Sequence, residues 1–326
     1  MRDDLIVVFG GSGFIGKYVV KTLAKTGARV RIAMRRPHLG HDLRVLGDVG
    51  QIQLVQANLR YADSVERAMD GADAAVNCVG LLFEKGPQRF KDVQAAGAAA
   101  IARAAAKHGI KRLVHISAIG ADAGSKSVYA RTKAEAEAAV CAAVPTATIL
   151  RPSIVFGAED QFFNRFADMA KFAPALPLIG GGKTRFQPVY VQDVAEAVCA
   201  ALSQPGAQGR TYELGGPKTY TFRELLDFIT RTIDRPRAYA PLPFALAQPM
   251  GALADAVFKF YPFAGPPLTG DQVELLKSDN VVGESGAPGI GTFADLGVAP
   301  LETIEAIVPS YLWRFRPHGQ FQTKPA

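Results

Sequence analysis

A glycine-rich turn near the start of the chain constrains the fold more than any other feature. The run GGSGFIG, residues 10–16, follows an apolar segment, Leu5–Phe9, and leads into a stretch with helical spacing, Ile15–Lys25. Glycines at these intervals between a strand and a helix are typical of a dinucleotide-binding βαβ unit. The sequence therefore predicts a Rossmann-type site at this turn.

Each position of the turn has a predicted task. Gly10 permits the tight turn, Gly13 lets the backbone approach a pyrophosphate, and Gly16 lets the helix pack closely on the strand. Phe14 and Ile15 open the helix, and we count them among the cofactor-binding residues. The N–H groups and the positive dipole end of the helix favour an anion there.

Strand-like and helical segments alternate through the first half of the chain. The predicted strands are Leu5–Phe9, Arg29–Ala33, Ile52–Val55, Ala74–Cys78, Arg112–Ile116 and Ala147–Leu150. The clearest helical patterns are Ile15–Lys25, Val93–Lys107 and Lys133–Ala142. Such alternation predicts an α/β fold, a doubly wound parallel sheet with helices on both faces.

The regular pattern weakens after residue 152, where prolines and glycines become frequent. We expect a dinucleotide-binding domain over residues 1–155 and a smaller substrate or partner lobe with a basic tail over residues 156–326. Residues 185–203, with a strand at Gln187–Val191 and a helix at Val194–Leu202, are expected to return to the first domain. The helices predicted in the lobe are Arg223–Thr232, Phe244–Phe260 and Leu301–Tyr311.

Two arginines follow the second predicted strand. NAD sites usually place a carboxylate at this point to bind the ribose hydroxyls, whereas this chain has Arg35 and Arg36 and no acid. Because guanidinium groups pair well with a phosphate dianion, NADP(H) is predicted rather than NAD(H). Ser12 is placed to add a hydrogen bond to the same 2′-phosphate. The alternative is that both arginines are solvated surface residues.

Short segments after the next two strands are further candidates for cofactor contacts. Asn58 and Leu59 follow the third strand, where they are placed to touch adenine. Val79 and Gly80 follow the fourth strand and offer a small, flat edge to the base.

A Tyr-x-x-x-Lys pair follows the fifth strand. Tyr129 and Lys133 share one face of a helix, and an ammonium group stabilises a neighbouring phenolate. Together with Ser117 at the strand end, they form a predicted catalytic set for proton exchange during hydride transfer. The next residue is Ala118, so a second hydroxyl that would polarise a carbonyl is missing, and turnover stays open.

The motifs GGSGFIG, YARTK and VYVQDVA together resemble the extended and atypical short-chain dehydrogenase/reductases. A closer resemblance lies in GDVGQ, residues 47–51, in RPSIVFG, residues 151–157, and in the DLG stretch, residues 295–297. These segments look like the NAD(P)H-binding accessory subunit of respiratory complex I, of the alpha-subcomplex subunit nine type. The missing transit peptide suggests a bacterial member or a mature chain.

The resemblance implies a bound NADPH with a mainly structural role. It also implies complex I subunits as partners and a cytoplasmic, peripheral position on the inner membrane, close to where quinone enters. By analogy, Pro152, Ser153 and Val155 would line the nicotinamide pocket.

Composition argues against nucleic-acid binding, a cysteine metal site and a membrane span. The formal charge is +7, but the arginines are spread out with no recognition motif, which argues against nucleic acid. The three cysteines show no metal-ligand spacing and are expected to be reduced, buried residues. No uninterrupted apolar stretch is long enough to span a membrane.

Two segments suggest a further surface. The apolar residues 238–268 are interpreted either as a surface for membrane or quinone or as an ordinary lobe core. The tail from Trp313 is basic, with Arg314, Arg316 and Lys324 and no acid. It is interpreted either as a docking segment or as a solvated, partly disordered terminus.

Three functions therefore remain open. The first is an accessory subunit or assembly factor of NADH:ubiquinone oxidoreductase that holds NADPH as a structural ligand. The second is a stand-alone NADPH-dependent reductase or epimerase-like enzyme, with quinone metabolism as one setting. The third is a binding module whose partner contact changes with the redox state of the nucleotide.

Overall fold

The computed structural model describes residues 1–260, 269–283 and 289–319. Residues 261–268 of the apolar segment and Lys324 of the basic tail lie outside them. The chain divides into two compact units. Unit 1 comprises Met1–Pro152, Val191–Leu214 and Ser285–Ala299, and unit 2 comprises Ser153–Tyr190, Gly215–Glu284 and Pro300–Ala326. None of the helices in the described ranges has both the length and the apolar character needed to cross a bilayer.

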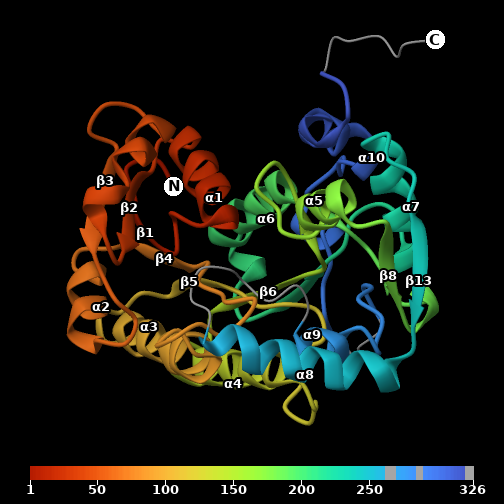
Figure 1. Cartoon of the computed structure of the whole chain (residues 1–326). Coiled ribbons are helices and arrows are strands. Elements are labelled where there is room, and N and C mark those ends of the chain that lie inside the picture. The colour runs from red at the N-terminus through yellow and green to blue at the C-terminus, as the bar shows by residue number, and fades with distance from the viewer. Residues whose placement is uncertain (261–268, 284–288, 320–326) are drawn as a thin grey trace. The chain divides into compact units, whose positions relative to one another are not determined.

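Unit 1 is built on a seven-stranded parallel sheet with the order β11-β6-β5-β4-β1-β2-β3 (Figure 1). Its strands are β1 (Leu5–Phe9), β2 (Arg29–Met34), β3 (Ile52–Gln56), β4 (Ala74–Asn77), β5 (Arg112–Ile116), β6 (Thr148–Pro152) and β11 (Thr211–Leu214). The order reverses direction at β1, which is the mark of a doubly wound sheet. The predicted fold class is confirmed.

Helices cover both faces of this sheet. α1 (Phe14–Lys25) and α6 (Val191–Ser203) lie on one face, and α2 (Ala62–Met69), α3 (Ala96–Lys107) and α4 (Val128–Ala143) lie on the other (Figure 1). Shorter helical turns of the unit are η1 (Pro37–Leu39), η2 (His41–Leu46), η3 (Lys91–Ala95), η5 (Pro205–Ala207) and η6 (Ala294–Leu296).

The core of unit 1 explains why these segments take these forms. All five residues of β1 are buried, as expected for a central parallel strand covered on both sides. Ala98, Ala102 and Ala105 of α3 are fully buried in the core on the α3 and α4 side. Their small side chains let α3 approach its neighbours closely, so the alanine-rich pattern follows from packing.

The helices on the α3 and α4 side of the sheet begin differently from the prediction. α4 starts at Val128 rather than at Lys133, because the Ser127 hydroxyl accepts a hydrogen bond from the Ala130 N–H group and caps the helix. The segment expected to be helical from Val93 opens with a π-helical turn, η3, before α3 begins. The expectation that all three cysteines are buried was also wrong, since Cys141 is exposed and Cys78 and Cys199 are half-buried.

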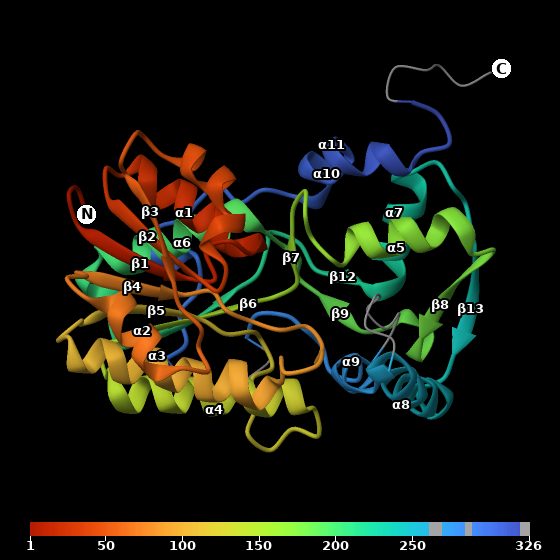
Figure 2. The same ribbon diagram turned by 60° about the vertical axis from the view of Figure 1, so that its left-hand side comes forward.

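Unit 2 packs short strands and helices around an aromatic core (Figure 2). Its strands are β7 (Val155–Phe156), β8 (Ala175–Ile179), β9 (Arg185–Phe186), β10 (Val189–Tyr190), β12 (Tyr220–Thr221) and β13 (Ala238–Leu242). Its helices are α5 (Phe163–Phe172), η4 (Gly180–Gly182), α7 (Phe222–Thr232), α8 (Phe244–Phe260), α9 (Gly270–Leu275), α10 (Ile304–Ile307), α11 (Pro309–Leu312) and η7 (Trp313–Phe315). The strands pair as β8 with β13, β7 with β10, and β9 with β12.

Two predictions for the second half of the chain were wrong in detail. The strand expected at Gln187–Val191 shrinks to β10, and Val191 already begins α6. The helix expected at Leu301–Tyr311 is split into α10 and α11. Thr303 caps α10, and Pro309, which has no N–H group to donate, starts α11.

Candidate functional site

The glycine turn after β1 has the geometry of a phosphate-binding loop. Gly10 has φ of 77°, a backbone conformation that favours glycine. A Cβ atom on Gly16 would lie 2.1 Å from the carbonyl oxygen of Gly10, so only glycine fits at that point of contact between helix and turn. Ser12 and Gly13 are exposed, which leaves the outer side of the turn open to a ligand.

The N-terminus of α1 is suited to an anion. Gly13 is the N-cap residue and has no side chain to bond the first N–H groups, and the first turn holds no acidic residue. Phe14 and Ile15 lie in this turn and are half-buried. The backbone donors and the helix dipole thus face no competing carboxylate in the first turn.

Arg35 and Arg36 follow directly after β2, whose residues Ala33 and Ile32 pair with the end of β1. Both arginines are exposed, and neither guanidinium group forms an ion pair or hydrogen bond with a described residue. They therefore stand at the same edge of the sheet as the glycine turn with their guanidinium donors available.

Asn58 and Leu59 follow β3 and have local structural partners. The Asn58 side-chain oxygen accepts a hydrogen bond from the Arg60 N–H group at 3.2 Å, which forms a turn. Leu59 packs against the core, and a Cβ on Gly97 of α3 would lie 2.9 Å from it. Their predicted contact with adenine stays a prediction.

Val79 and Gly80 form the loop after β4. Val79 packs against the core and its N–H group donates to the Asn77 side-chain oxygen at 3.0 Å. Gly80 is exposed, and a Cβ placed on it would lie 3.7 Å from the Lys133 Nζ atom. The structure therefore brings this loop beside the lysine of the Tyr-x-x-x-Lys pair.

Tyr129 and Lys133 lie one turn apart on α4. The Lys133 Nζ atom is 5.8 Å from the centre of the Tyr129 ring, and the ring packs edge-to-face against Phe90. Lys133 is buried and donates to the Ile116 carbonyl oxygen at the end of β5 over 3.0 Å. An ammonium group has three N–H donors, so Lys133 keeps donors for a ligand.

Burial controls the charge of this lysine. It lowers the Lys133 pKa to about 8, while the Glu137 carboxylate, one turn further along α4, opposes the shift. Lys133 is therefore largely protonated at neutral pH but titrates within an accessible range.

Ser117 follows β5 and is buried. Its N–H group donates to the Leu150 carbonyl oxygen at 2.7 Å, whereas its hydroxyl has no hydrogen-bond partner among the described residues. Buried hydroxyl groups are rarely left without a partner, so the Ser117 hydroxyl is available to bond a ligand or an ordered water at this point. Ser117, Gly80 and Gly10 all follow the ends of adjacent strands, where doubly wound sheets bind their ligands.

A buried Asn77–His115 pair lies next to these residues and was not predicted. The Asn77 side-chain nitrogen lies 3.0 Å from His115 Nδ1. Since the Asn77 oxygen already accepts from Val79, its nitrogen is the donor in this pair. Burial, with a smaller contribution from Lys133, lowers the His115 pKa to about 3, so the ring is neutral at pH 7.

Gln94 is a second residue that sequence reasoning missed. It lies in the π-helical turn η3, a form frequent at functional sites, and is almost fully buried. Its side-chain oxygen accepts from the Leu81 N–H group at 3.1 Å, and its nitrogen donates to the Thr132 hydroxyl at 3.1 Å. Gln94 thus ties the loop after β4 to α4 beside Lys133. In the sequence, only its place as a polar residue within an alanine-rich stretch could have pointed to Gln94.

Pro152, Ser153 and Val155 fall on both sides of the division between the units. Pro152 ends β6 in unit 1, and its carbonyl oxygen accepts from the Ile119 N–H group at 3.1 Å. Ser153 and Val155 belong to unit 2, where the Ser153 hydroxyl bonds the side-chain oxygen of Asn280 at 2.6 Å. A shared nicotinamide pocket therefore stays a prediction.

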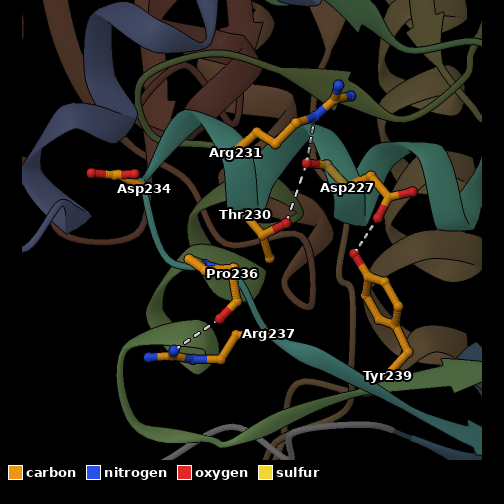
Figure 3. Close-up of a pocket in the computed structure, with 7 residues that line it drawn as sticks. All are labelled: Asp227, Thr230, Arg231, Asp234, Pro236, Arg237 and Tyr239. Atoms are coloured by element: carbon orange, nitrogen blue, oxygen red, sulfur yellow. Dashed lines mark hydrogen bonds between the residues drawn. The ribbon is translucent and has the colours of Figure 1, made fainter.

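Unit 2 contains a pocket of its own. It is lined by Asp227, Thr230, Arg231, Asp234, Pro236, Arg237 and Tyr239 (Figure 3). The Tyr239 hydroxyl donates to the Asp227 carboxylate at 2.5 Å, and the Arg231 Nε donates to the Asp227 carbonyl oxygen at 3.1 Å. Its polar groups are largely bonded to one another, so it offers no set of convergent groups for a substrate. No group of residues suited to a metal ion occurs in the described ranges.

The residues of unit 1 fit a nicotinamide dinucleotide. The glycine turn accepts no side chain at Gly16, the Ser117 hydroxyl lacks a protein partner, and Lys133 has donors to spare. The family comparison agrees with this fit. Residues 6–215 match the model of the NAD dependent epimerase/dehydratase family, which implies a nicotinamide cofactor.

Relatives along nearly the whole chain carry the name of a complex I subunit. The chain is 37% identical to NADH dehydrogenase [ubiquinone] 1 alpha subcomplex subunit 9, mitochondrial, of Arabidopsis thaliana, over 96% of this chain and 78% of the relative. It is 35% identical to the protein of that name in Mus musculus, over 98% and 84%. Both are mitochondrial proteins and give no support to the bacterial source inferred above.

Solved structures agree on the fold. The crystal structure of gox2253 superimposes with a TM-score of 0.70 at 20% identity, covering 95% of this chain and 98% of that one. The chain therefore belongs to the NAD dependent epimerase/dehydratase family, and its relatives within it include the alpha subcomplex subunit 9 proteins of NADH:ubiquinone oxidoreductase.

Proposed function

We propose that this protein is an accessory subunit or assembly factor of NADH:ubiquinone oxidoreductase that holds NADP(H) mainly as a structural ligand. Similarity to subunit 9 proteins over nearly the whole chain supports the association with complex I. A peripheral position on the membrane, on the side that bears the hydrophilic arm, follows from that association.

The observation that carries the choice of cofactor is the pair Arg35 and Arg36. Both are exposed directly after β2, at the sheet edge that bears the glycine turn, and both lack a described anionic partner. A 2′-phosphate would satisfy both charges, whereas the ribose hydroxyls of NAD(H) would find no carboxylate there. Ser12, exposed on the turn, would donate to the same phosphate.

A structural role for the nucleotide agrees with the rest of the site. Ala118 replaces the second hydroxyl expected beside a reacting carbonyl, and removal of such a donor lowers the rate roughly a hundredfold or more. The experiment is native purification under mild salt, followed by identification of the released nucleotide and of the copurifying proteins. NADPH together with complex I subunits supports the proposal. Isolation of the protein without any complex I subunit, and with NAD⁺ as the bound nucleotide, contradicts it.

A stand-alone NADPH-dependent reductase is the second candidate, with a quinone or another carbonyl compound as substrate. The proximity of Tyr129, Lys133 and the unpartnered Ser117 hydroxyl favours it. In that case Lys133 would hold the nicotinamide ribose and Tyr129 would pass a proton to the reduced oxygen.

The Tyr129→Phe substitution separates the two candidates. In a reductase it abolishes substrate-dependent oxidation of NADPH while the fold and NADPH affinity persist. In a structural subunit no such oxidation is present to lose, and assembly of the complex is unchanged.

A further inference from the structure

Unit 2 carries a group of arginines without acidic partners. We call it the arginine cluster, and it consists of Arg231, Arg235, Arg237, Arg314 and Arg316. None of the five forms an ion pair with a carboxylate in the described part of the chain. They come from the end of α7, the following loop and the residues at the end of η7, so the fold, and not a run in the sequence, brings them together.

Backbone carbonyl groups hold these side chains in place. The Nε atom of Arg235 donates to the Phe315 carbonyl oxygen at 2.9 Å, and that of Arg316 donates to the Thr232 carbonyl oxygen at 2.9 Å. Arg237 is held in the same way by Ala170 at 2.8 Å. Bonds through Nε leave the terminal nitrogens of Arg231, Arg235 and Arg316 available. One terminal nitrogen of Arg237 donates to the Pro236 carbonyl oxygen at 3.0 Å, and one of Arg314 donates to the Asn164 side-chain oxygen at 2.5 Å. In Figure 3 the Arg231 guanidinium points away from the pocket.

The acidic groups of this region are already engaged. The Asp227 carboxylate accepts from the Tyr239 hydroxyl, and Asp168 pairs with Lys171 at 3.5 Å. Asp234 also has an interaction of its own. Asp227 and Asp234 keep their negative charge beside the cluster, because a hydroxyl donor such as that of Tyr239 carries no charge. The five arginines outnumber these two carboxylates, so the cluster keeps a surplus of positive charge.

Aromatic rings lie among these cations. Phe172 at the end of α5 is 81% exposed, and Trp313 is 37% exposed. The Lys171 ammonium lies 5.1 Å from the Phe172 ring and 5.8 Å from the Phe315 ring. Exposed aromatic rings flanked by cations are typical of surfaces that enter the headgroup region of a membrane.

From this juxtaposition we infer that the arginine cluster and Phe172 form a docking surface for an anionic phospholipid membrane. A guanidinium group can bind two phosphate oxygens at once. Each cation near an anionic leaflet contributes about 1 kcal/mol of binding free energy, so five arginines together can hold the protein at the membrane. The inference goes beyond the proposed function, because the surface lies wholly in unit 2 and uses no residue of the nucleotide site.

Vesicle flotation with the full chain tests this surface. The vesicles are phosphatidylcholine alone, or phosphatidylcholine with roughly a third phosphatidylglycerol, at low and high salt. We expect binding to the anionic vesicles only, with loss at high salt. The Arg231→Gln/Arg316→Gln variant should bind on the order of tenfold to thirtyfold more weakly, because two surface charges are removed.

Two control variants and one further test make the result specific. Arg231→Lys/Arg316→Lys keeps the charge and should bind nearly as well as the parent chain. Arg67→Gln/Arg103→Gln removes the same net charge from exposed positions of unit 1 and should have little effect. Phe172→Ser should weaken binding several-fold while thermal unfolding and NADPH affinity stay unchanged.

Several outcomes overturn the inference. Equal binding to neutral and anionic vesicles would show that the contact is apolar. An equal loss of binding in Arg67→Gln/Arg103→Gln would show that only the net charge of the chain matters. Binding of polyglutamate without vesicle binding would identify an acidic protein surface as the partner.

Discussion

In unit 1, the Lys133 ammonium donates a hydrogen bond to the Ile116 carbonyl oxygen over 3.0 Å, which fixes it where β5 ends. The contact joins α4 to the sheet edge that also holds the glycine turn and the loop after β4. Since Lys133 is buried there with donors to spare, its charge is directed at whatever occupies the site.

Lys133→Met should weaken the binding of NADPH by roughly tenfold to a hundredfold, the range for a lost hydrogen bond to a charged group. Adenosine 2′,5′-bisphosphate, which lacks the nicotinamide ribose, should bind as before. Calorimetric titration with both ligands checks this. Equal weakening of both would show that the substitution damages the fold rather than one contact.

Gly16→Ala should destabilise the chain by about 1–3 kcal/mol, because its methyl group would overlap the Gly10 carbonyl oxygen. Gly206→Ala is the matched control, since nothing lies within 4 Å of a Cβ at that position. Urea unfolding of both variants measures the difference. A stable Gly16→Ala variant with intact NADPH binding would disprove the close packing described here.

The Asn77–His115 pair predicts a loss of stability in acid. The folded-state His115 pKa is about 3, below the ordinary value of 6.5, so between these values the unfolded state binds more protons than the folded state. Stability should therefore fall as pH drops from 6.5 towards 3, with a slope of up to roughly 1.4 kcal/mol per pH unit from this group. Denaturant unfolding across this range, with His115→Asn as reference, checks the slope. An unchanged slope in the variant would contradict the assignment.

Gln94→Leu should lower stability by about 1–3 kcal/mol, because the Leu81 N–H group and the Thr132 hydroxyl both lose a partner. Thr132→Val removes the acceptor of the Gln94–Thr132 hydrogen bond and leaves the bond to Leu81 in place. The double variant should lose less stability than the two single variants lose together, since both substitutions break the same Gln94–Thr132 hydrogen bond. Strict additivity in urea unfolding would show that the two side chains do not interact in solution.

The sheet of unit 1 was largely predictable from the sequence, because central parallel strands are apolar on both faces. β1 and β5 have the bounds that the sequence predicts. β11 was missed, since its Glu213 is buried beside Arg151, at 3.9 Å, and interrupts the apolar pattern. A buried ion pair between distant segments leaves no local signal.

Part of the candidate site was also predictable from the sequence, and part was not. The glycine turn and the Tyr129–Lys133 pair lie within short motifs, so their spacing alone suggests their chemistry. Gln94 and the Asn77–His115 pair come together only when separate segments fold against one another. The same holds for the arginine cluster, whose members are spread from residue 231 to residue 316.

Calorimetric titration of the nucleotide-free protein with NADPH and with NADH measures the cofactor preference of the glycine turn and its neighbouring arginines. We expect binding of both, with NADPH at least roughly tenfold tighter through contacts of Arg35 and Arg36 with the 2′-phosphate. The Arg35→Ala/Arg36→Ala variant should lose that preference while still binding NADH. Uptake of neither nucleotide, or tighter binding of NADH by the parent chain, would contradict this expectation.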